Sequence, residues 1–397
     1  MAAIIYCVIQ GLKGGDFKIY MGAAELLHEG KSCYNEWILL GGENYGQYSY
    51  SPFFASLLIP FTYLPKGSAQ ILWLLVNLFF LQRVFSFIRS FLHLDRLSLA
   101  QQYLWGFITL LLSLRFVLHN FEMVQMTIFL LFCCTEAVRQ TQQKRAWLSG
   151  LLLALGIVVK ILPLVMIPYF IYRNQWKPLP YLIGFVIILL LFPAVFFGWE
   201  MNQNLLSDWW GIINPSNTEF VAEQNKFGEG IHSLSGLLAA YFSDTPSFWG
   251  IEEPRIIKVL SAEKLSIMLS SLRLLFILFT LYFLRTLPFR AAKSSLHQLW
   301  ELSYILGLVP LIFPHQQKYA FFFLTPAIAY VVYQWISSNR PRLTPLLLSL
   351  FFLLAVFTTD GIVGDQLNDL SEHYKTITFG TFCLLIALAS CRPKALK

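Results

Sequence analysis

Charged residues are scarce in this chain of 397 residues. Asp, Glu, Lys and Arg together make up only 13% of it, roughly half the share of a soluble globular protein. Hydrophobic residues make up 56%, and the mean hydropathy is +0.59. So few charges would leave the surface of a soluble domain of this size uncovered. The sequence therefore predicts an all-α polytopic membrane protein, and it excludes a nucleic-acid-binding module, a secreted enzyme and a disordered protein.

Motifs for metals, disulfides and nucleotides are also missing. The six cysteines fit no metal-ligand spacing and no disulfide framework. No P-loop, HExxH, GxSxG or paired CxxC motif is present. We therefore disfavour soluble-nucleotide chemistry and zinc hydrolysis. Since no cluster of carboxylates demands a metal either, we expect an activity that is independent of metals and cofactors.

Long apolar segments dominate what is present. A membrane-spanning helix needs about 20 mostly apolar residues, and nine segments approach that length. They are Ala69 to Phe87, Gln101 to Leu118, Val124 to Val138, Leu179 to Phe197, Leu265 to Leu284, Leu296 to Phe313, Tyr319 to Ile336, Leu343 to Phe357 and Thr376 to Ala389. With shorter apolar stretches, we expect about 10–12 transmembrane or re-entrant helices in a single domain over residues 1–397.

The loops between these segments predict their orientation. One kind is short and basic, as at Arg139, Lys144 and Arg145. The other kind is longer and mixed in charge, at residues 13–65, 198–264 and 360–375. Basic loops of membrane proteins collect on the cytoplasmic side, and this preference also accounts for the net charge of +7. The mixed loops are then external.

Residues 146–172 depart from this alternation because the apolar segment has basic flanks at both ends. A re-entrant hairpin that turns between Lys160 and Pro163 keeps both flanks on one side. We then expect Lys160 to face a polar cavity; the alternative is a lysine that snorkels from an ordinary tilted helix. Residues 1–12 are apolar but too short for an ordinary span. Either they form a short, tilted first crossing, or the natural start of the chain lies upstream.

The first external loop carries the candidate base. Asp16 follows the opening apolar stretch and precedes an amphipathic segment with Ile19, Ala23 and Leu26 on one face. A carboxylate at the start of an interfacial helix is suited to act as a base toward an amphiphilic substrate. The simpler alternative is that Asp16 caps this helix.

Three other external turns hold polar side chains. The turn of residues 119–125 includes Glu122 and Gln125 as candidate substrate contacts, and Arg115 lies one helical turn before it. The alternative is that Arg115 and Glu122 form an ion pair with a structural role only. The turn of residues 227–236 holds His232, for which a solvated loop histidine is the simpler interpretation. His315 and Lys318 lie in the turn of residues 313–319 and suit a phosphate at headgroup level; the alternative is an interfacial anchor.

The order of these elements resembles glycosyltransferase family 87, a group of polyprenol-phosphate-sugar-dependent, mannosyltransferase-like membrane enzymes of the GT-C superfamily. The similarity extends over nearly the whole chain. The residues that carry it are Asp16, Tyr20, Ala24, Gly30, Tyr34, Tyr50, Pro52, Pro60, Pro65, Trp73, Asn77, Gly150, Lys160, Pro163 and His315. The chain departs from the family pattern around Gln125 and His232, where only part of each motif is kept, and this leaves the sugar and the acceptor open.

The resemblance implies a GT-C fold with an active site at the outer face of the bacterial cytoplasmic membrane. The expected partners are the lipid membrane, a polyprenyl-monophosphate hexose donor, with mannose as the expected sugar, and a glycolipid or surface-glycan acceptor. Asp16 would be the catalytic base of an inverting transfer. The expected donor-phosphate and substrate contacts are Lys160, His315, Lys318, His232, Glu122, Gln125 and Tyr50.

Two other functions stay open at this point. A transporter or flippase for a lipid-linked sugar would be expected to show paired repeats with broken helices, and this sequence offers one broken segment. A glycan ligase of the O-antigen type would use a diphosphate-linked donor. The sequence does not indicate an oligomeric state.

Overall fold

The computed structural model describes residues 2–34, 37–40, 43–65, 67–214, 230–244, 247, 250–252, 254–284, 288–292, 294–337 and 343–393. The fold is helical, as predicted, with one antiparallel β-hairpin within this part of the chain. The chain forms two compact units, of which the first comprises Met1–Phe87 and His119–Asn217 and the second Ile88–Leu118 and Thr218–Lys397.

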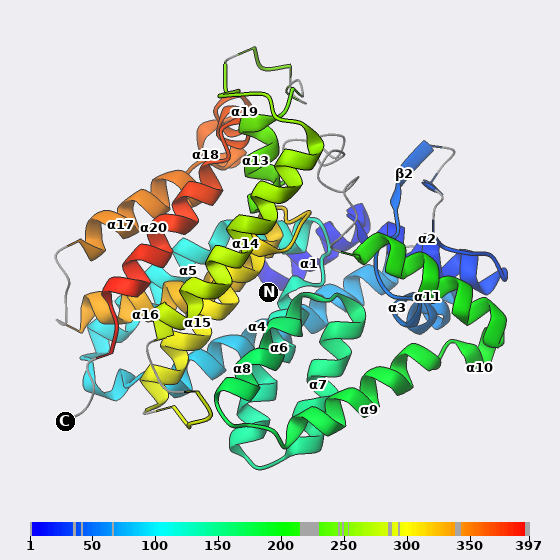
Figure 1. Ribbon diagram of the computed structural model, residues 1–397, viewed down its shortest axis with the longest axis horizontal. Coiled ribbons are helices and arrows are strands. Elements are labelled where there is room, and N and C mark those ends of the chain that lie inside the picture. Colours follow the sequence, from blue (N-terminus) through cyan, green and yellow to red (C-terminus); the bar gives the residue numbers. More distant parts are fainter. Residues whose placement is uncertain are drawn as a thin grey trace. The chain divides into compact units, whose positions relative to one another are not determined.

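The first unit contains most of the N-terminal half of the chain (Figure 1). Its elements are α1 (Ala2–Lys13), α2 (Phe17–His28), β1 (Trp37–Leu40), β2 (Glu43–Gln47), α3 (Pro52–Leu58), η1 (Ile59–Tyr63), most of α4 (Ser68–Phe91), α6 (Thr127–Gln142), α7 (Ala146–Val159), η3 (Leu162–Val165), α8 (Met166–Tyr172), α9 (Pro178–Leu191), α10 (Ala194–Phe197) and α11 (Trp199–Ile213).

Helices α6 and α7 form an antiparallel pair that determines where Lys160 lies. The Thr141 hydroxyl near the end of α6 is 2.8 Å from that of Ser149 near the start of α7. At the other end of the pair, Gly156 of α7 lies close to Cys133 of α6. The C-terminal end of α7 therefore returns to the end of the unit at which α6 begins. Lys160 follows that end directly, and Gln125 precedes the start of α6.

The expected break in the apolar segment 146–172 is present. Helix α7 ends at Val159, Lys160 is extended with φ −151° and ψ 130°, and η3 begins at Leu162. Pro163 explains why α7 does not continue, because a proline has no N–H to donate to the carbonyl oxygen of Val159 and its ring would clash with that carbonyl in an unbroken helix. The re-entrant path itself stays a prediction.

The amphipathic face of α2 is not the one expected. Of Ile19, Ala23 and Leu26, only Ala23 is buried. The buried large side chains are instead Phe17, Tyr20 and Leu27, spaced three and seven residues apart along one helical face. The two assignments differ because Phe17 and Tyr20 pack against aromatic residues from α3 and α4, which are distant in sequence.

The second unit contains the remaining helices (Figure 1). They are η2 (Leu94–Arg96), most of α5 (Leu99–Glu122), α13 (Leu234–Phe242), α14 (Ala262–Leu284), α15 (Ser295–Ile312), η5 (Lys318–Leu324), α16 (Thr325–Ile336), α17 (Thr344–Phe351), the π-helical turn η6 (Phe352–Val356), α18 (Asp360–Val363), α19 (Asp365–His373) and α20 (Thr376–Ser390). Within this unit, α17 packs against α20, and α16 packs against both α15 and α20.

Five segments in the described part are long and apolar enough to cross a membrane: Ser68–Phe91, Leu99–Glu122, Pro178–Phe197, Ala262–Leu284 and Lys318–Ile336. The other four expected spans form helices that are shorter or more polar. Helix α6, for example, has 16 residues and holds Glu136, whose carboxylate accepts two hydrogen bonds from Arg83.

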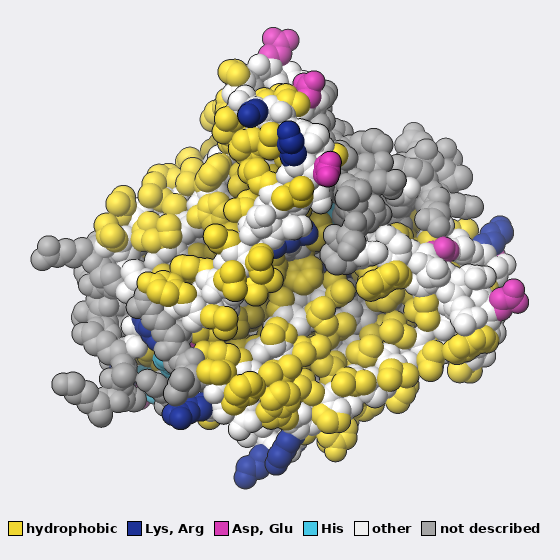
Figure 2. Space-filling view, in the orientation of Figure 1, with side chains coloured by type: hydrophobic (Ala, Val, Ile, Leu, Met, Phe, Trp, Pro, Cys, Tyr) yellow, Lys and Arg dark blue, Asp and Glu magenta, His cyan; other side chains and the backbone are white. Residues whose placement is uncertain are grey.

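Apolar side chains cover much of the face seen in Figure 2. Along α9 and α10, Ile183, Ile187, Ile188, Val195 and Phe196 are all exposed. Soluble monomers rarely expose a continuous apolar surface of this extent. Lipid contact explains such a helix surface, and the chain is therefore a multi-pass membrane protein.

Gly150 permits a close approach of α7 to α9. A Cβ atom at this position would lie 2.7 Å from the backbone nitrogen of Leu182 and 2.8 Å from the carbonyl oxygen of Pro178. We predict that Gly150→Ala destabilises the protein by about 1–3 kcal/mol, because backbone atoms must move to admit the methyl group. The measurement is the thermal unfolding midpoint in detergent.

The matched control is Gly184→Ala on α9, where a Cβ atom meets no neighbour within 4 Å. Alanine favours the helix there by about 0.5–1 kcal/mol, so this variant should unfold at the same or a higher temperature. Equal effects of the two substitutions would contradict the packing argument.

Candidate active site

Two glycines and a backbone hydrogen bond hold Asp16 in place. Gly14 and Gly15 have φ values of +88° and +44°, which glycine adopts readily and other residues do not. A Cβ atom on Gly15 would lie 2.5 Å from the carbonyl carbon of Met123. The N–H of Asp16 donates to the carbonyl oxygen of the same Met123 at 3.0 Å. The loop between α1 and α2 is therefore attached to the turn between α5 and α6.

The carboxylate of Asp16 does not cap α2. Asp16 occupies the N-cap position, but its side chain accepts no hydrogen bond from the helix backbone. Instead, its Oδ2 atom accepts a hydrogen bond of 2.6 Å from Nε2 of Gln125. The simpler sequence-based interpretation, a capping aspartate, is therefore wrong for the side chain, which faces the residues around Gln125.

Gln125 connects Asp16 to two tyrosines. Its Oε1 atom accepts hydrogen bonds from the hydroxyls of Tyr20 at 3.1 Å and Tyr50 at 3.2 Å. These two hydroxyls are themselves 2.9 Å apart. An amide oxygen only accepts and an amide nitrogen only donates, so the two phenols and the carboxylate together determine the orientation of the amide. All three uncharged members are buried.

Strong local constraints position Gln125. Its N–H donates to the carbonyl oxygen of Asn120, and its own carbonyl oxygen accepts from the indole of Trp73. The preceding Val124 has φ +50°, a left-handed conformation that is costly for a β-branched residue. Backbone strain of this kind is concentrated at functional sites.

Tyr50 is held in the same way, and it contacts the lysine of the helix break. The hydroxyl of Tyr34 donates to the carbonyl oxygen of Tyr50 at 2.6 Å, and α3 begins two residues later with Ser51 as its cap. The Nζ atom of Lys160 lies 3.4 Å from the Tyr50 hydroxyl and 5.1 Å from the centre of its ring. The latter geometry is that of a cation–π contact.

The site thus contains a carboxylate and an ammonium group joined through buried polar residues. Asp16 and Lys160 are each partly accessible, whereas Gln125 and Tyr50 are 3% and 5% exposed. Burial raises the pKa of the Asp16 carboxyl above its ordinary value, and the hydrogen bond from Gln125 and the charges of His119 and Lys160 oppose that shift. A carboxylate with a raised pKa is a stronger base than an exposed one.

Glu122 and Arg115 have different partners from those expected. Glu122 is exposed, and its carboxylate lies 3.4 Å from Nδ1 of His119. The guanidinium of Arg115 donates instead to Thr358, to Asn368 and to the carbonyl oxygen of Ala355. The expected Arg115–Glu122 pair is therefore not the one formed, because the guanidinium of Arg115 is bound within its own unit by η6, Thr358 and α19.

The other three expected contacts belong to the second unit. His232 is fully buried, which contradicts a solvated loop histidine; its N–H donates to Gln316, and its carbonyl oxygen accepts from Thr378. Lys318 forms an ion pair of 2.5 Å with Glu372. His315 has φ +54°. Residues 227–229, which open the glycine-containing turn, lie outside the described residues.

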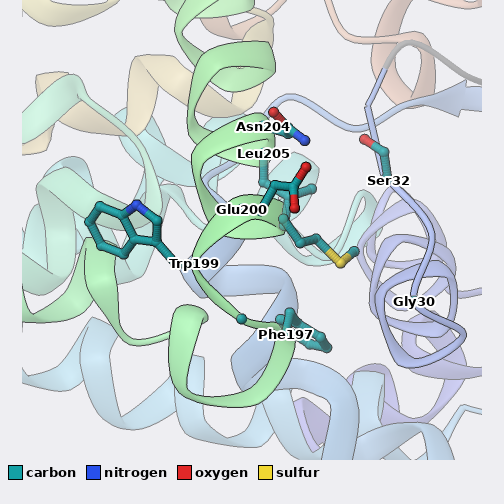
Figure 3. A pocket seen from close by; sticks show the side chains of 9 residues that line it. Gly30, Ser32, Phe197, Trp199, Glu200, Asn204 and Leu205 are labelled. Atoms are coloured by element: carbon teal, nitrogen blue, oxygen red, sulfur yellow. The ribbon is translucent and has the colours of Figure 1, made fainter.

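A hollow of about 600 Å³ lies elsewhere in the first unit, between the end of α2 and the start of α11. It is lined by Gly30, Ser32, Phe197, Gly198, Trp199, Glu200, Met201, Asn204 and Leu205 (Figure 3). None of these residues was identified from the sequence as a site candidate. A signal was available, because Glu200, Asn204 and Asp208 are spaced four residues apart and so share one face of α11. The sequence does not reveal that this face lies opposite Ser32.

Sequence reasoning also missed the role of Gly15. The adjacent glycines before Asp16 were the available signal, since paired glycines mark a turn with unusual backbone angles. The partner that makes Gly15 necessary, the carbonyl of Met123, is more than 100 residues away in the sequence, so the pattern alone does not reveal it.

The fold and this site define a multi-pass membrane protein with a carboxylate-centred polar site in a helical unit. The sequence profile described as glycosyltransferase family 87 matches residues 48–296, more than half of the chain. The chain belongs to this family. The matched segment includes Tyr50, Gln125 and Lys160, whereas Asp16 lies before it. We find no match among curated proteins and none among solved structures.

The raised pKa of Asp16 predicts how stability depends on pH. The folded protein holds the Asp16 proton more tightly than the unfolded chain, in which the ordinary pKa is 3.8. The stabilisation is therefore complete below about pH 4 and is lost as the pH rises through the folded-state pKa. We predict that the Asp16→Asn variant, which keeps an acceptor oxygen for Gln125, gains stability relative to the wild type over that interval.

Thermal unfolding midpoints of both proteins, measured in detergent from about pH 4 to pH 8, test this prediction. The two proteins share all other titrating groups, so the difference between their midpoints at each pH reports on Asp16 alone. A difference between the two proteins that stays constant with pH would show that the pKa of Asp16 is the same in the folded and unfolded chains.

Proposed function

We propose that this family 87 glycosyltransferase moves a hexose, with mannose as the expected sugar, from a polyprenyl-monophosphate donor to a glycolipid or surface-glycan acceptor. The observation that carries the proposal is the Asp16 carboxylate, which is partly accessible, does not cap its helix and accepts a hydrogen bond from Gln125. A carboxylate held in this way is suited to receive a proton from an acceptor hydroxyl.

The proposed reaction is a single displacement with Asp16 as the base. The acceptor oxygen attacks the anomeric carbon, the bond from that carbon to the phosphate oxygen breaks, and its electron pair leaves with the phosphate. The proton of the acceptor hydroxyl passes to Asp16. One displacement inverts the anomeric centre, whereas retention requires a second carboxylate as nucleophile. Positive side chains rather than a metal ion would compensate the phosphate charge.

Lys160 is the proposed phosphate contact in the first unit. It follows the break between α7 and η3, and its ammonium group is in contact with Tyr50, which shares Gln125 with Asp16. A fixed cation stabilises the charge that develops on a leaving phosphate. His315, Lys318 and His232 stay proposed donor contacts from the second unit, with the Lys318 charge balanced by Glu372.

We place the reaction at the outer face of the bacterial cytoplasmic membrane. The support is the asymmetry of the loops. Asp16 and Tyr50 come from the mixed loop 13–65 and Gln125 comes from the turn 119–125, whereas basic loops such as that at residues 139–145 favour the cytoplasmic side. A lipid-linked donor would reach the site from the surrounding bilayer.

Asp16→Asn is predicted to lower the transfer rate by about 100-fold or more, because general-base catalysis contributes factors of about 10²–10⁴. The assay is transfer of radiolabelled mannose from a polyprenyl-phosphate donor to membrane glycolipids by the purified protein in liposomes. The control is Glu25→Gln, an exposed carboxylate on the same helix, which should retain full activity.

The wild-type rate should also rise with pH through the folded-state pKa of Asp16, since only the ionised carboxylate accepts a proton. Full activity of a correctly folded Asp16→Asn protein would exclude Asp16 as the base. Size-exclusion profiles and unfolding midpoints of both variants establish that they are folded.

Lys160→Met is predicted to raise the KM for the donor by about tenfold, as expected for the loss of one charge-assisted hydrogen bond. Lys160→Arg, which retains the charge, should restore most of the affinity. Lys177→Met at the exposed start of α9 is the control. Donor kinetics at a fixed acceptor concentration measure the effect, and an unchanged KM in Lys160→Met would remove Lys160 from the donor site.

A further inference from the structure

The hollow between α2 and α11 is separate in its residues from the Asp16 site. Its volume of about 600 Å³ lies within the usual range for small-molecule sites. Gly30 and Ser32 form one wall, just after α2, and the first turns of α11 form the other. Figure 1 shows α2 and α11 near each other within this unit.

The polar side chains of the hollow are directed into it. Figure 3 shows Glu200 and Asn204 on the side of α11 that faces Ser32, whereas the ring of Trp199 points the other way. Glu200 and Asn204 are exposed to solvent, and within the described part of the chain the carboxylate and the amide form no hydrogen bond or ion pair with protein atoms, so both can bind a ligand in the hollow. The hydroxyl of Ser32 lies 3.3 Å from the carboxylate of Asp208.

These groups match a neutral ligand rich in hydroxyls. A carboxylate accepts hydrogen bonds, and an amide both donates and accepts them, which complements sugar hydroxyls. None of the described residues that line the hollow is basic. A phosphate group there would face the negative charge of Glu200 without a compensating cation, so the lining disfavours the donor phosphate.

Helix α2 connects this hollow to the candidate base. Asp16 directly precedes the helix and Gly30 follows it by two residues. With a rise of about 1.5 Å per residue, the 12 residues of α2 separate the two places by about 18 Å. This distance is longer than one sugar ring, so a single ligand that occupies both must contain several sugar units.

We propose that the hollow is an acceptor subsite that binds a sugar unit of an oligosaccharide whose terminal hydroxyl lies at Asp16. The inference rests on the proposed glycosyl transfer and specifies its acceptor as an extended oligosaccharide rather than a lipid with one sugar. Glu200, Asn204 and Ser32 supply the hydrogen bonds that select the longer acceptor.

The test measures binding, so it does not require turnover. Purified Asp16→Asn protein in detergent is titrated calorimetrically with octyl glycosides of mannose and of glucose that contain one, two, four or six sugars. We expect affinity to increase with length. On the same background, Glu200→Ala and Asn204→Ala should each weaken binding of the six-sugar glycoside by about tenfold and leave the one-sugar glycoside unchanged.

Gln203→Ala is the matched control, because Gln203 is exposed on the same helix and does not line the hollow. Equal binding of all lengths, an equal effect of Gln203→Ala, or no binding in either sugar series overturns the subsite. Full transfer activity of Asp16→Asn overturns the base instead and leaves the binding result intact, so the two failures are distinguishable.

Discussion

The side-chain amide of Gln125 is the interaction on which the candidate site depends. Its nitrogen donates to Asp16 and its oxygen accepts from Tyr20 and Tyr50. Because Gln125 is buried, the loss of one of these partners would leave a buried polar group without a hydrogen bond, at a cost of about 1–3 kcal/mol. The amide therefore has one favourable orientation, and that orientation determines which way the Asp16 carboxylate faces.

Backbone strain supports the same arrangement. Gly15 and Val124 both adopt left-handed backbone angles, and they lie on either side of the hydrogen bond between Asp16 and Met123. Only glycine fits at position 15, where a side chain would meet the Met123 carbonyl. Val124 has no such freedom, so the packing around it must hold the strained conformation. The site is thus preorganised before a substrate binds.

The buried charges of the second unit are arranged differently. Arg115 donates a hydrogen bond to Asn368, Asn368 donates one to Glu372, and Glu372 forms an ion pair with Lys318. The π-helical turn η6 contributes the carbonyl of Ala355 to Arg115. Such polar networks join helices within membrane proteins. In the first unit, by contrast, Lys160 contacts the hydroxyl and the ring of Tyr50, and Tyr50 shares Gln125 with Asp16.

The sequence by itself determined the class of the protein and the positions of its breaks. The scarcity of charge required a membrane environment, Pro163 ended the helix near Lys160, and Asp16 stood out as the first acidic residue after the apolar opening stretch. These features depend on composition and on neighbours within a few residues, which is the range over which helical periodicity and backbone geometry operate.

The tertiary structure alone decided what those residues contact. It placed Gln125 rather than the α2 backbone against Asp16, directed Arg115 away from Glu122, and formed a hollow between Ser32 and Glu200. The physical reason is that each contact joins residues more than 100 positions apart in the sequence. Which partner such a side chain faces therefore depends on how whole helices pack against one another. No local pattern encodes that packing.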